Sequence, residues 1–270
     1  MATAVKTKAA GKKPVQRAKA APAKRVVAKT ALYLYGVSLP TRNKVEIRAE
    51  AVDGEAAIES TRFDGFDCWV SRVDRSEYAD HLAENMEDLE WLAMIGVRHQ
   101  RAVADLASKL EMLPARFGTV FLSEQSLKEH VASGKKNFKA VFKKIAGSDE
   151  WGIKVFRAAQ PGRAVIVEAA SGTDYLKSKA QSVMPRAKEE DSKLLELVQA
   201  LSGLSVDMAP GGKASSGQPS LVWHGSFLVR RSAQKKFAST LRKFTAEFSE
   251  GYRVECSGPW PPYSFVGQHG

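Results

Sequence analysis

The chain has 270 residues, which is enough for two modest cores, and 44% of them are hydrophobic, as in an ordinary globular protein. No window approaches the roughly 18 consecutive apolar residues of a membrane span, and the N-terminus lacks the apolar run of a secretory signal. These features argue against a membrane-spanning or secreted protein, so we expect a cytoplasmic one.

The net charge of +11 is concentrated at the N-terminus. Residues 1–30 contain seven Lys, two Arg and no acidic residue, and prolines interrupt any helical pattern. Removing those nine from the 41 basic residues leaves 32 against 30 acidic residues, so the remainder is nearly neutral. We expect residues 1–30 to form a disordered basic arm. Such an arm could contact phosphates or an acidic surface, or could serve as a solubilising tail.

Residues 31–147 have the pattern of an N-terminal α+β domain. The apolar run from Leu32 to Val37 predicts a central strand, and strands are also predicted over 45–51, 55–61 and 66–73. Asp53-Gly54 and Asp64-Gly65 predict tight turns between them. A major helix is expected from about 86 to 110, with one apolar stripe formed by Leu89, Leu92, Gly96, His99, Val103, Leu106 and Leu110.

His99 interrupts this stripe. A histidine there could act as an acid or base, but a hydrogen-bonded core histidine is the more common case.

The stretch from Met112 to Phe121 joins the helical pattern to a strand pattern. Pro114 cannot continue a helix, and Gly118 permits backbone angles closed to other residues. Arg116 lies between apolar neighbours that include Phe117. We interpret Pro114, Arg116, Phe117 and Gly118 as a structural connector. Arg116 is expected to pair with carboxylates or carbonyl oxygens inside the protein.

Two helices should follow, from Ser123 through Val131 and from about 134 to 146. The second has five lysines on one face. A nucleic-acid groove is conceivable there, but the aromatic residues lie on the opposite, apolar face, which favours a solvated basic surface.

Residues 148–257 predict a second domain. Strands are expected over 151–158, 205–208, 221–230 and 252–256, with helices over 172–200 and 233–248. This β-α-β-β-α-β order is the split βαβ, or ferredoxin-like, topology. The tail, residues 258–270, carries Trp260, Tyr263 and Phe265, which could pack against the protein's own domains or form a partner site.

Motifs for catalysis or cofactor binding are missing. The sequence has no Walker phosphate loop, no GxGxxG after a strand, no HExxH and no GxSxG. The five histidines and the two cysteines, Cys68 and Cys256, do not have the spacing of metal ligands. We therefore expect a non-enzymatic protein without cofactor, metal or catalytic residue.

Five stretches lie in order between about residues 31 and 266. They are Leu32-Tyr-Leu-Tyr-Gly-Val, Glu84-Asn-Met-Glu-Asp-Leu-Glu-Trp-Leu, Leu113-Pro-Ala-Arg-Phe-Gly-Thr-Val-Phe, Glu150-Trp-Gly-Ile-Lys-Val-Phe and Gly258-Pro-Trp-Pro-Pro-Tyr-Ser-Phe. Together they resemble the gas vesicle accessory family GvpF/GvpL. The chain departs from the family at Ala115, where Leu is frequent, and in its basic arm.

The resemblance implies a cytoplasmic protein that serves gas vesicle formation, either as an assembly factor or as a minor component of the vesicle. It also implies an N-terminal α+β domain and a ferredoxin-like C-terminal domain. The implied partners are GvpA, the small and very apolar shell protein, and other accessory proteins. A nucleic-acid-associated role through the basic arm is the distant alternative, and nothing in the sequence indicates an oligomeric state.

Overall fold

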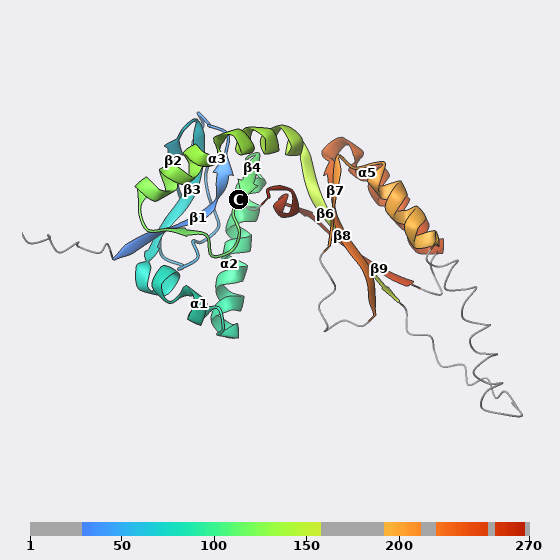
Figure 1. The fold of residues 1–270 in the computed structure, drawn as a ribbon, viewed down its shortest axis with the longest axis horizontal. Helices are drawn as coiled ribbons and strands as arrows, with labels where there is room; N and C mark the ends of the chain where they lie inside the picture. The colour runs from blue at the N-terminus through green and yellow to red at the C-terminus, as the bar shows by residue number, and fades with distance from the viewer. Residues whose placement is uncertain (1–28, 158–191, 212–219, 248–251, 268–270) are drawn as a thin grey trace, which may run out of the picture.

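The computed structural model describes residues 29–157, 192–211, 220–247 and 252–267. They form two lobes, an N-terminal lobe (residues 29–147) and a C-terminal lobe (residues 148–260), each built on an antiparallel sheet (Figure 1). The predicted arm and most of the predicted helix over 172–200 lie outside the described residues. Among the described residues, no helix combines the length and apolar character that crossing a membrane requires.

The first sheet has the order β2-β3-β1-β4, and β5 also pairs with β1. Its strands are β1 (Thr30–Ser38), β2 (Glu59–Phe63), β3 (Phe66–Asp74), β4 (Met112–Pro114) and β5 (Val120–Phe121). The predicted turn between β2 and β3 is present, since Asp64 and Gly65 both have positive φ. The central position predicted for Leu32 to Val37 is also present, because β1 lies between β3 and β4.

The strand predicted over 45–51 is wrong. Its alternating Val45, Ile47 and Ala49 do pack against the core, but the segment pairs with no strand among the described residues. Instead, the Arg48 N–H donates to the Asp105 carboxylate at 2.7 Å. The alternating apolar residues therefore indicate which side of this segment is buried. Its backbone donates a hydrogen bond to a helix side chain instead of pairing with a strand.

Strand β1 is buried on both faces, which explains its continuous apolar run. Leu32 and Leu34 face α3 (Glu124–Ile145), whereas Tyr33 and Tyr35 face α2 (Leu89–Ala107). The register shifts between Leu34 and Gly36, and the side chain that follows Gly36 therefore faces α3, as that of Leu34 does. The N-terminal lobe thus consists of one sheet between two helical layers.

Helix α2 is shorter than the predicted 86–110. Asp88 caps it by accepting hydrogen bonds from the N–H groups of Glu90 and Trp91, and the chain before it forms η1 (Ser76–Asp80) and α1 (Leu82–Asn85). The predicted apolar stripe is wrong at its N-terminal end, because Leu89 is 77% exposed. The buried residues of α2 are Ile95, His99, Ala102, Val103 and Leu106.

Helix α3 is a single helix, so the break predicted after Val131 is wrong. Ser123 does cap it, through a capping box with Ser126. Gly134 lies inside the helix against the Phe138 ring, where a Cβ would come within 2.8 Å of that ring. Val131 and Phe138, on either side of Gly134, are both buried in the core, so packing keeps the helix continuous despite the glycine's low helix propensity.

The second sheet has the order β7-β8-β6-β9 with every pair antiparallel. Its strands are β6 (Ser148–Arg157), β7 (Asp207–Pro210), β8 (Leu221–Arg230) and β9 (Tyr252–Trp260). Helix α5 (Gln234–Glu247) follows the short η2 (Arg231–Ala233), and residues 192–202 are also helical. Strand β9 continues through Trp260, beyond the predicted end at 256, because that part of the chain still pairs with β6.

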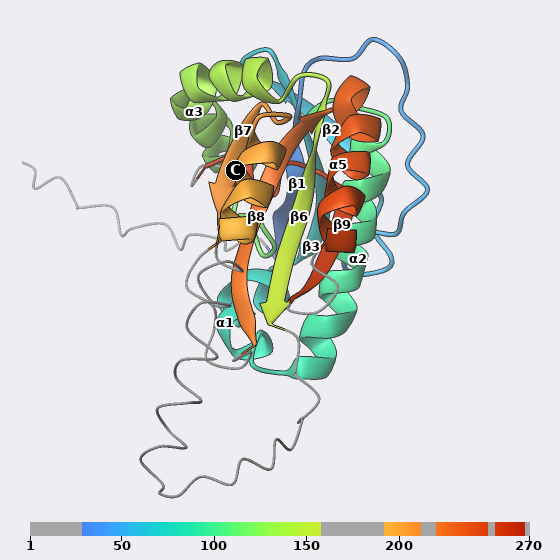
Figure 2. The same ribbon diagram turned by 90° about the vertical axis from the view of Figure 1, so that its right-hand side faces the viewer.

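Helix α5 lies on the side of the second sheet that faces away from the N-terminal lobe (Figure 2). Residues of both lobes meet on the sheet's other side. The core around α3 includes Leu228 of β8 as well as Phe265 and Val266 of the tail. The two lobes thus share one hydrophobic core at their junction.

Candidate functional site at the lobe junction

The connector is attached to the central strand by its backbone. Leu113 and Pro114 pair with β1, the Ala115 N–H donates to the Tyr35 carbonyl at 2.9 Å, and Val120 pairs with Tyr33. Pro114 is buried at the end of β4. The residues between these two pairings form a short loop at the edge of the sheet.

The side chains of Arg116 and Phe117, both in this loop, lie in different environments. Phe117 packs into the core beside α2, with its ring centroid 5.7 Å from that of His99. Arg116 is exposed, and its Nη2 donates to the Gly267 carbonyl at 3.3 Å. The expected carbonyl partner is present, but the expectation that it lies inside the protein is wrong. Backbone pairing, rather than a buried cation, attaches the connector to the sheet.

Gly118 connects this loop to a buried polar network. It has φ of +77°, and its N–H donates to the Tyr33 hydroxyl at 3.1 Å. That hydroxyl is also 3.0 Å from His99 Nδ1, and His99 is only 3% exposed. Burial lowers the pKa of His99 to about 4 and raises that of the Tyr33 hydroxyl above its ordinary value. His99 is therefore a neutral, hydrogen-bonded core residue near pH 7.

The tail folds back between the two lobes. Phe265 is buried in the shared core, and the Tyr263 hydroxyl donates to Gln100 of α2 at 3.4 Å. Burial, and then the negative charge of Glu150, raise the pKa of Tyr263. Ser264 donates to the Glu150 carboxylate through both its N–H and its hydroxyl. Tyr263 and Phe265 are thus contacts between the lobes.

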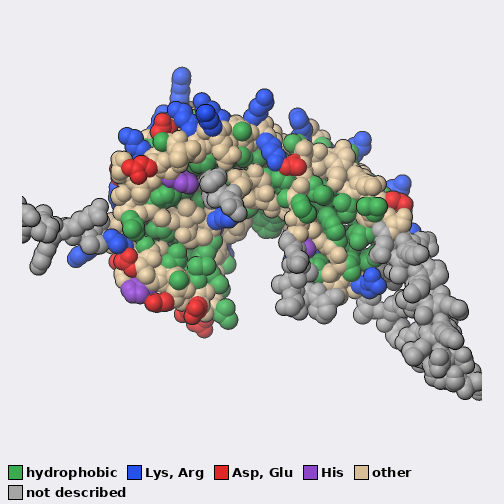
Figure 3. Space-filling model, in the orientation of Figure 1, with side chains coloured by type: hydrophobic (Ala, Val, Ile, Leu, Met, Phe, Trp, Pro, Cys, Tyr) green, Lys and Arg blue, Asp and Glu red, His purple; other side chains and the backbone are tan. Residues whose placement is uncertain are grey.

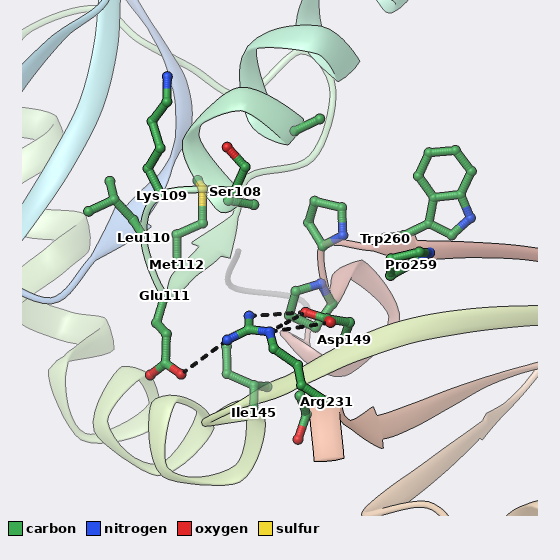
Figure 4. Close-up of a pocket in the computed structure, with 15 residues that line it drawn as sticks. Ser108, Lys109, Leu110, Glu111, Met112, Ile145, Asp149, Arg231, Pro259 and Trp260 are labelled. Atoms are coloured by element: carbon green, nitrogen blue, oxygen red, sulfur yellow. Dashed lines mark hydrogen bonds and ion pairs between the residues drawn. The ribbon is translucent and has the colours of Figure 1, made fainter. Parts of the chain in front are cut away.

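A cavity of about 460 Å³ lies where the lobes meet (Figure 4). One part of its lining is charged. Arg231 donates to Asp149 at 3.0 Å, and its Nη1 is 4.0 Å from the Glu111 carboxylate. Glu111 also accepts a hydrogen bond from the Gly147 N–H at 2.7 Å. These contacts bridge the end of the first sheet and the start of the second.

The rest of the lining is largely apolar. Trp260 lies beside it with 42% of its surface exposed, and Figure 4 places its indole apart from the Arg231 ion pair. The other apolar residues come from α2, the segment around β4, the end of α3 and the tail: Ala104, Ala107, Leu110, Met112, Ile145, Pro259, Pro261 and Pro262. Of the three tail aromatics, Trp260 alone is left available to another molecule.

Sequence reasoning missed the polar residues of this junction. Glu150 and Ser264 both occur in the stretches that carried the family resemblance, but neither was assigned a role. Their pairing could not be inferred, because 114 positions separate them and no local pattern marks a buried carboxylate.

The described residues show no arrangement typical of a metal site or a reactive thiol. No group of three His, Cys, Asp or Glu side chains among them could hold a metal ion. Cys68 is buried, and burial raises its pKa to about 12; burial also raises the pKa of Cys256. Neither cysteine is in a disulfide. Because their pKa values are raised, both thiols are protonated near neutral pH.

Comparison with known proteins gives consistent matches. The family model described as gas vesicle synthesis protein GvpL/GvpF matches residues 31–267. Gas vesicle protein L of a Streptomyces species is 27% identical over 251 residues, covering 87% of this chain and 92% of its relative. Gas vesicle protein F1 of Halobacterium salinarum is 21% identical over 238 residues, covering 88% and 93%.

Two crystal structures share the fold. GvpF from an Anabaena species matches with a TM-score of 0.66 at 17% identity, over 88% of this chain and 96% of that one. GvpF from Microcystis aeruginosa matches with a TM-score of 0.63 at 16% identity, over 87% and 98%. The family match begins at residue 31, so the basic arm precedes the matched region. On the strength of the match over residues 31–267, the chain belongs to the gas vesicle GvpL/GvpF family.

Proposed function

We propose that this chain is a gas vesicle accessory protein that acts by binding, without catalysis. Its partners would be the hydrophobic shell protein GvpA, other accessory proteins, or both. The observation that carries the proposal is the half-exposed Trp260 beside the apolar lining of the junction cavity. Family membership supports a role in gas vesicles, and the cavity supports binding as the mode of action.

The chemistry of the cavity suits an apolar partner. Buried tryptophans are frequent anchors in protein interfaces, and three prolines next to Trp260 add a surface that loses little conformational entropy on binding. The Arg231–Asp149 pair at the other end would form part of a polar rim. A shell subunit with exposed apolar surface gains most from such shielding before it assembles.

We also infer that residues 148–257 form a ferredoxin-like domain. The strand order β7-β8-β6-β9 supports this inference, since the first strand of the unit lies between the third and the fourth. The junction cavity would then lie at the border between this domain and the N-terminal one.

The proposal can be tested by co-purification from cells that express the complete gas vesicle gene cluster. Tagged chain should recover GvpA, and Trp260→Ala should recover at least about fivefold less. Leu195→Ala is the matched control, because Leu195 is exposed at 57% and is not among the residues that line the cavity. Equal recovery with Trp260→Ala and the control would contradict the proposal. Point variants are preferable to tail deletion, because Phe265 and Val266 belong to the core.

Vesicles from the same cells can be used to test whether the chain is an assembly factor or a minor vesicle component. Isolated vesicles are washed with salt and then with urea, and the attached proteins are identified by mass spectrometry. An assembly factor should be released by mild washing, whereas a vesicle component should remain.

A further inference from the structure

The solvent-facing side of α2 is unusually apolar. Leu89, Met94 and Val97 are 77%, 48% and 49% exposed, and Ala93 is exposed beside them. Positions 89, 93 and 97 follow one another at intervals of four, so they form one line along the helix, with Met94 at its border. We call these four residues the outer stripe. The opposite side of α2 already supplies the core, so this helix is apolar on two sides.

Helix α3 provides the contrast. Its exposed side has Lys136, Lys139 and Lys143, whereas its buried side holds Phe138 and Phe142. That is the ordinary pattern of a surface helix. The exposed apolar line on α2 departs from this pattern. Exposed apolar patches are typical of surfaces that contact another molecule.

The outer stripe adjoins a strongly acidic part of the chain. Residues 74–90 contain seven Asp and Glu and a single Arg, a net charge of −6 in a chain whose total is +11. Glu84, Glu87 and Glu90 are exposed at the N-terminal end of the stripe. A partner therefore meets an apolar line with negative charge at one end.

The described part of the chain leaves the stripe exposed along its length. Helix α2 lies on the side of the N-terminal lobe that faces the C-terminal lobe (Figure 1), and the surface is hollowed between the lobes (Figure 3). In Figure 3, hydrophobic side chains gather at the lower end of the left-hand lobe beside this hollow, with acidic side chains next to them. The hollow leaves room for an element that lies against α2.

We propose that the outer stripe binds an amphipathic helix of a second protein. The apolar side of that helix packs on Leu89, Met94 and Val97, and its Lys or Arg residues face the exposed glutamates. Two packed helices contact each other through side chains at three- and four-residue spacing, and complementary charge fixes the orientation of the partner.

Charge argues against nucleic acid and anionic lipid surfaces, which a net charge of −6 repels. Residues 1–28 of the chain itself are basic, but their sequence has no amphipathic pattern and so lacks the apolar side that the stripe requires. The inference does not rest on the proposed role of Trp260, because the stripe lies on the N-terminal half of α2 and the cavity on the C-terminal end.

The first test measures recognition with a defined probe. Fluorescein-labelled LKKLLKLLKKLLKL should bind the full chain in an anisotropy titration, and the acidic peptide LEELLELLEELLEL should bind at least tenfold more weakly. Met94→Ser with Val97→Ser should weaken the basic peptide's binding at least tenfold, whereas the exposed control Leu195→Ser should not. Glu84→Gln with Glu87→Gln and Glu90→Gln should weaken binding and reduce its salt dependence. Equal binding by both peptides, or by all variants, would overturn the proposal.

The second test identifies the natural occupant. A photo-crosslinking p-benzoylphenylalanine replaces Val97, or Leu195 as control, in cells that express the gas vesicle gene cluster, and mass spectrometry locates the crosslinked segment. A segment of another protein with an apolar helical side and flanking Lys or Arg supports the proposal. A segment of a second copy, a segment of residues 1–28, or no crosslink above the control would overturn it. Recovery of GvpA with the Trp260→Ala variant is scored separately, so failure here is distinguishable from failure of the proposed function.

Discussion

Glu150 on β6 and Ser264 in the tail are joined by two hydrogen bonds, from the Ser264 N–H at 2.8 Å and from its hydroxyl at 2.6 Å. The Glu150 residue is only 7% exposed, so its carboxylate needs these donors. The pair holds the tail against the second sheet at the point where Phe265 enters the shared core. The tail is therefore a structural part of the junction.

Replacing Glu150 should destabilise the protein. Glu150→Ala leaves the Ser264 donors without their acceptor, and we expect the free energy of unfolding to fall by about 2 kcal/mol. Ser264→Ala removes one of the two bonds and should cost about 1 kcal/mol. Urea unfolding of both single variants and the double variant measures the coupling between them. Glu255→Ala serves as control, since Glu255 is exposed on β9, and a loss as large there would count against the assigned role of Glu150.

The buried histidine should make stability depend on pH. Burial lowers the pKa of His99 to about 4 from an ordinary value of 6.5. Between those pH values the unfolded chain binds a proton that the folded chain excludes, so stability falls as the pH falls through this window. The loss is complete below pH 4 and amounts to about 3 kcal/mol.

Comparing variants isolates this effect from the titration of carboxylates. His99→Gln should show a shallower decline than the natural protein between pH 7 and pH 4.5 in urea unfolding. His81→Gln changes an exposed histidine and serves as the matched control. Parallel curves for the natural protein and His99→Gln would show that His99 does not carry the effect.

Two glycines should respond in opposite directions to alanine. A Cβ at Gly36 would lie 2.2 Å from Met112 Cε and 2.5 Å from the Leu113 carbonyl oxygen, because β4 pairs closely with β1 there. Gly36→Ala should therefore lower the free energy of unfolding by about 1–3 kcal/mol. Gly96 is inside α2, and no described side chain or neighbouring element lies within 4 Å of an added Cβ, so Gly96→Ala should stabilise by up to about 1 kcal/mol. Thermal melting of both variants checks the opposite signs.

Local patterns predicted the strands best where burial was continuous. Strand β8 was predicted over 221–230 and extends from Leu221 to Arg230, and the continuous apolar run of β1 indicated its central place. Strand β1 is buried on both faces from Ala31 to Ser38, and β8 is buried from Phe227 to Val229, so sequence and packing demand the same structure there.

The failures share one physical cause, which is that distant contacts decide the outcome. Nothing local shows that Asp105 satisfies the backbone near Arg48, or that Val131 and Phe138, on either side of Gly134, are buried in one core with residues from distant strands. Leu89 fitted the apolar period of α2 but is exposed, since it is in the first turn after the Asp88 cap and no described element covers that turn. The same difficulty applied to the junction, whose polar pairs connect residues far apart in the chain.

Phe265 and Trp260 should separate stability from binding. Phe265 is 6% exposed and packs with residues of both lobes, with the Lys144 ammonium 5.5 Å from its ring centroid. Phe265→Ala should lower the free energy of unfolding by about 3–5 kcal/mol, because it leaves a cavity in the core that the two lobes share. Trp260 is 42% exposed, so Trp260→Ala should cost below about 1 kcal/mol. Urea unfolding measures both values. If Trp260→Ala lowers the free energy of unfolding only slightly, the reduced recovery of GvpA with this variant measures binding. A decrease as large as that of Phe265→Ala would assign Trp260 to the core.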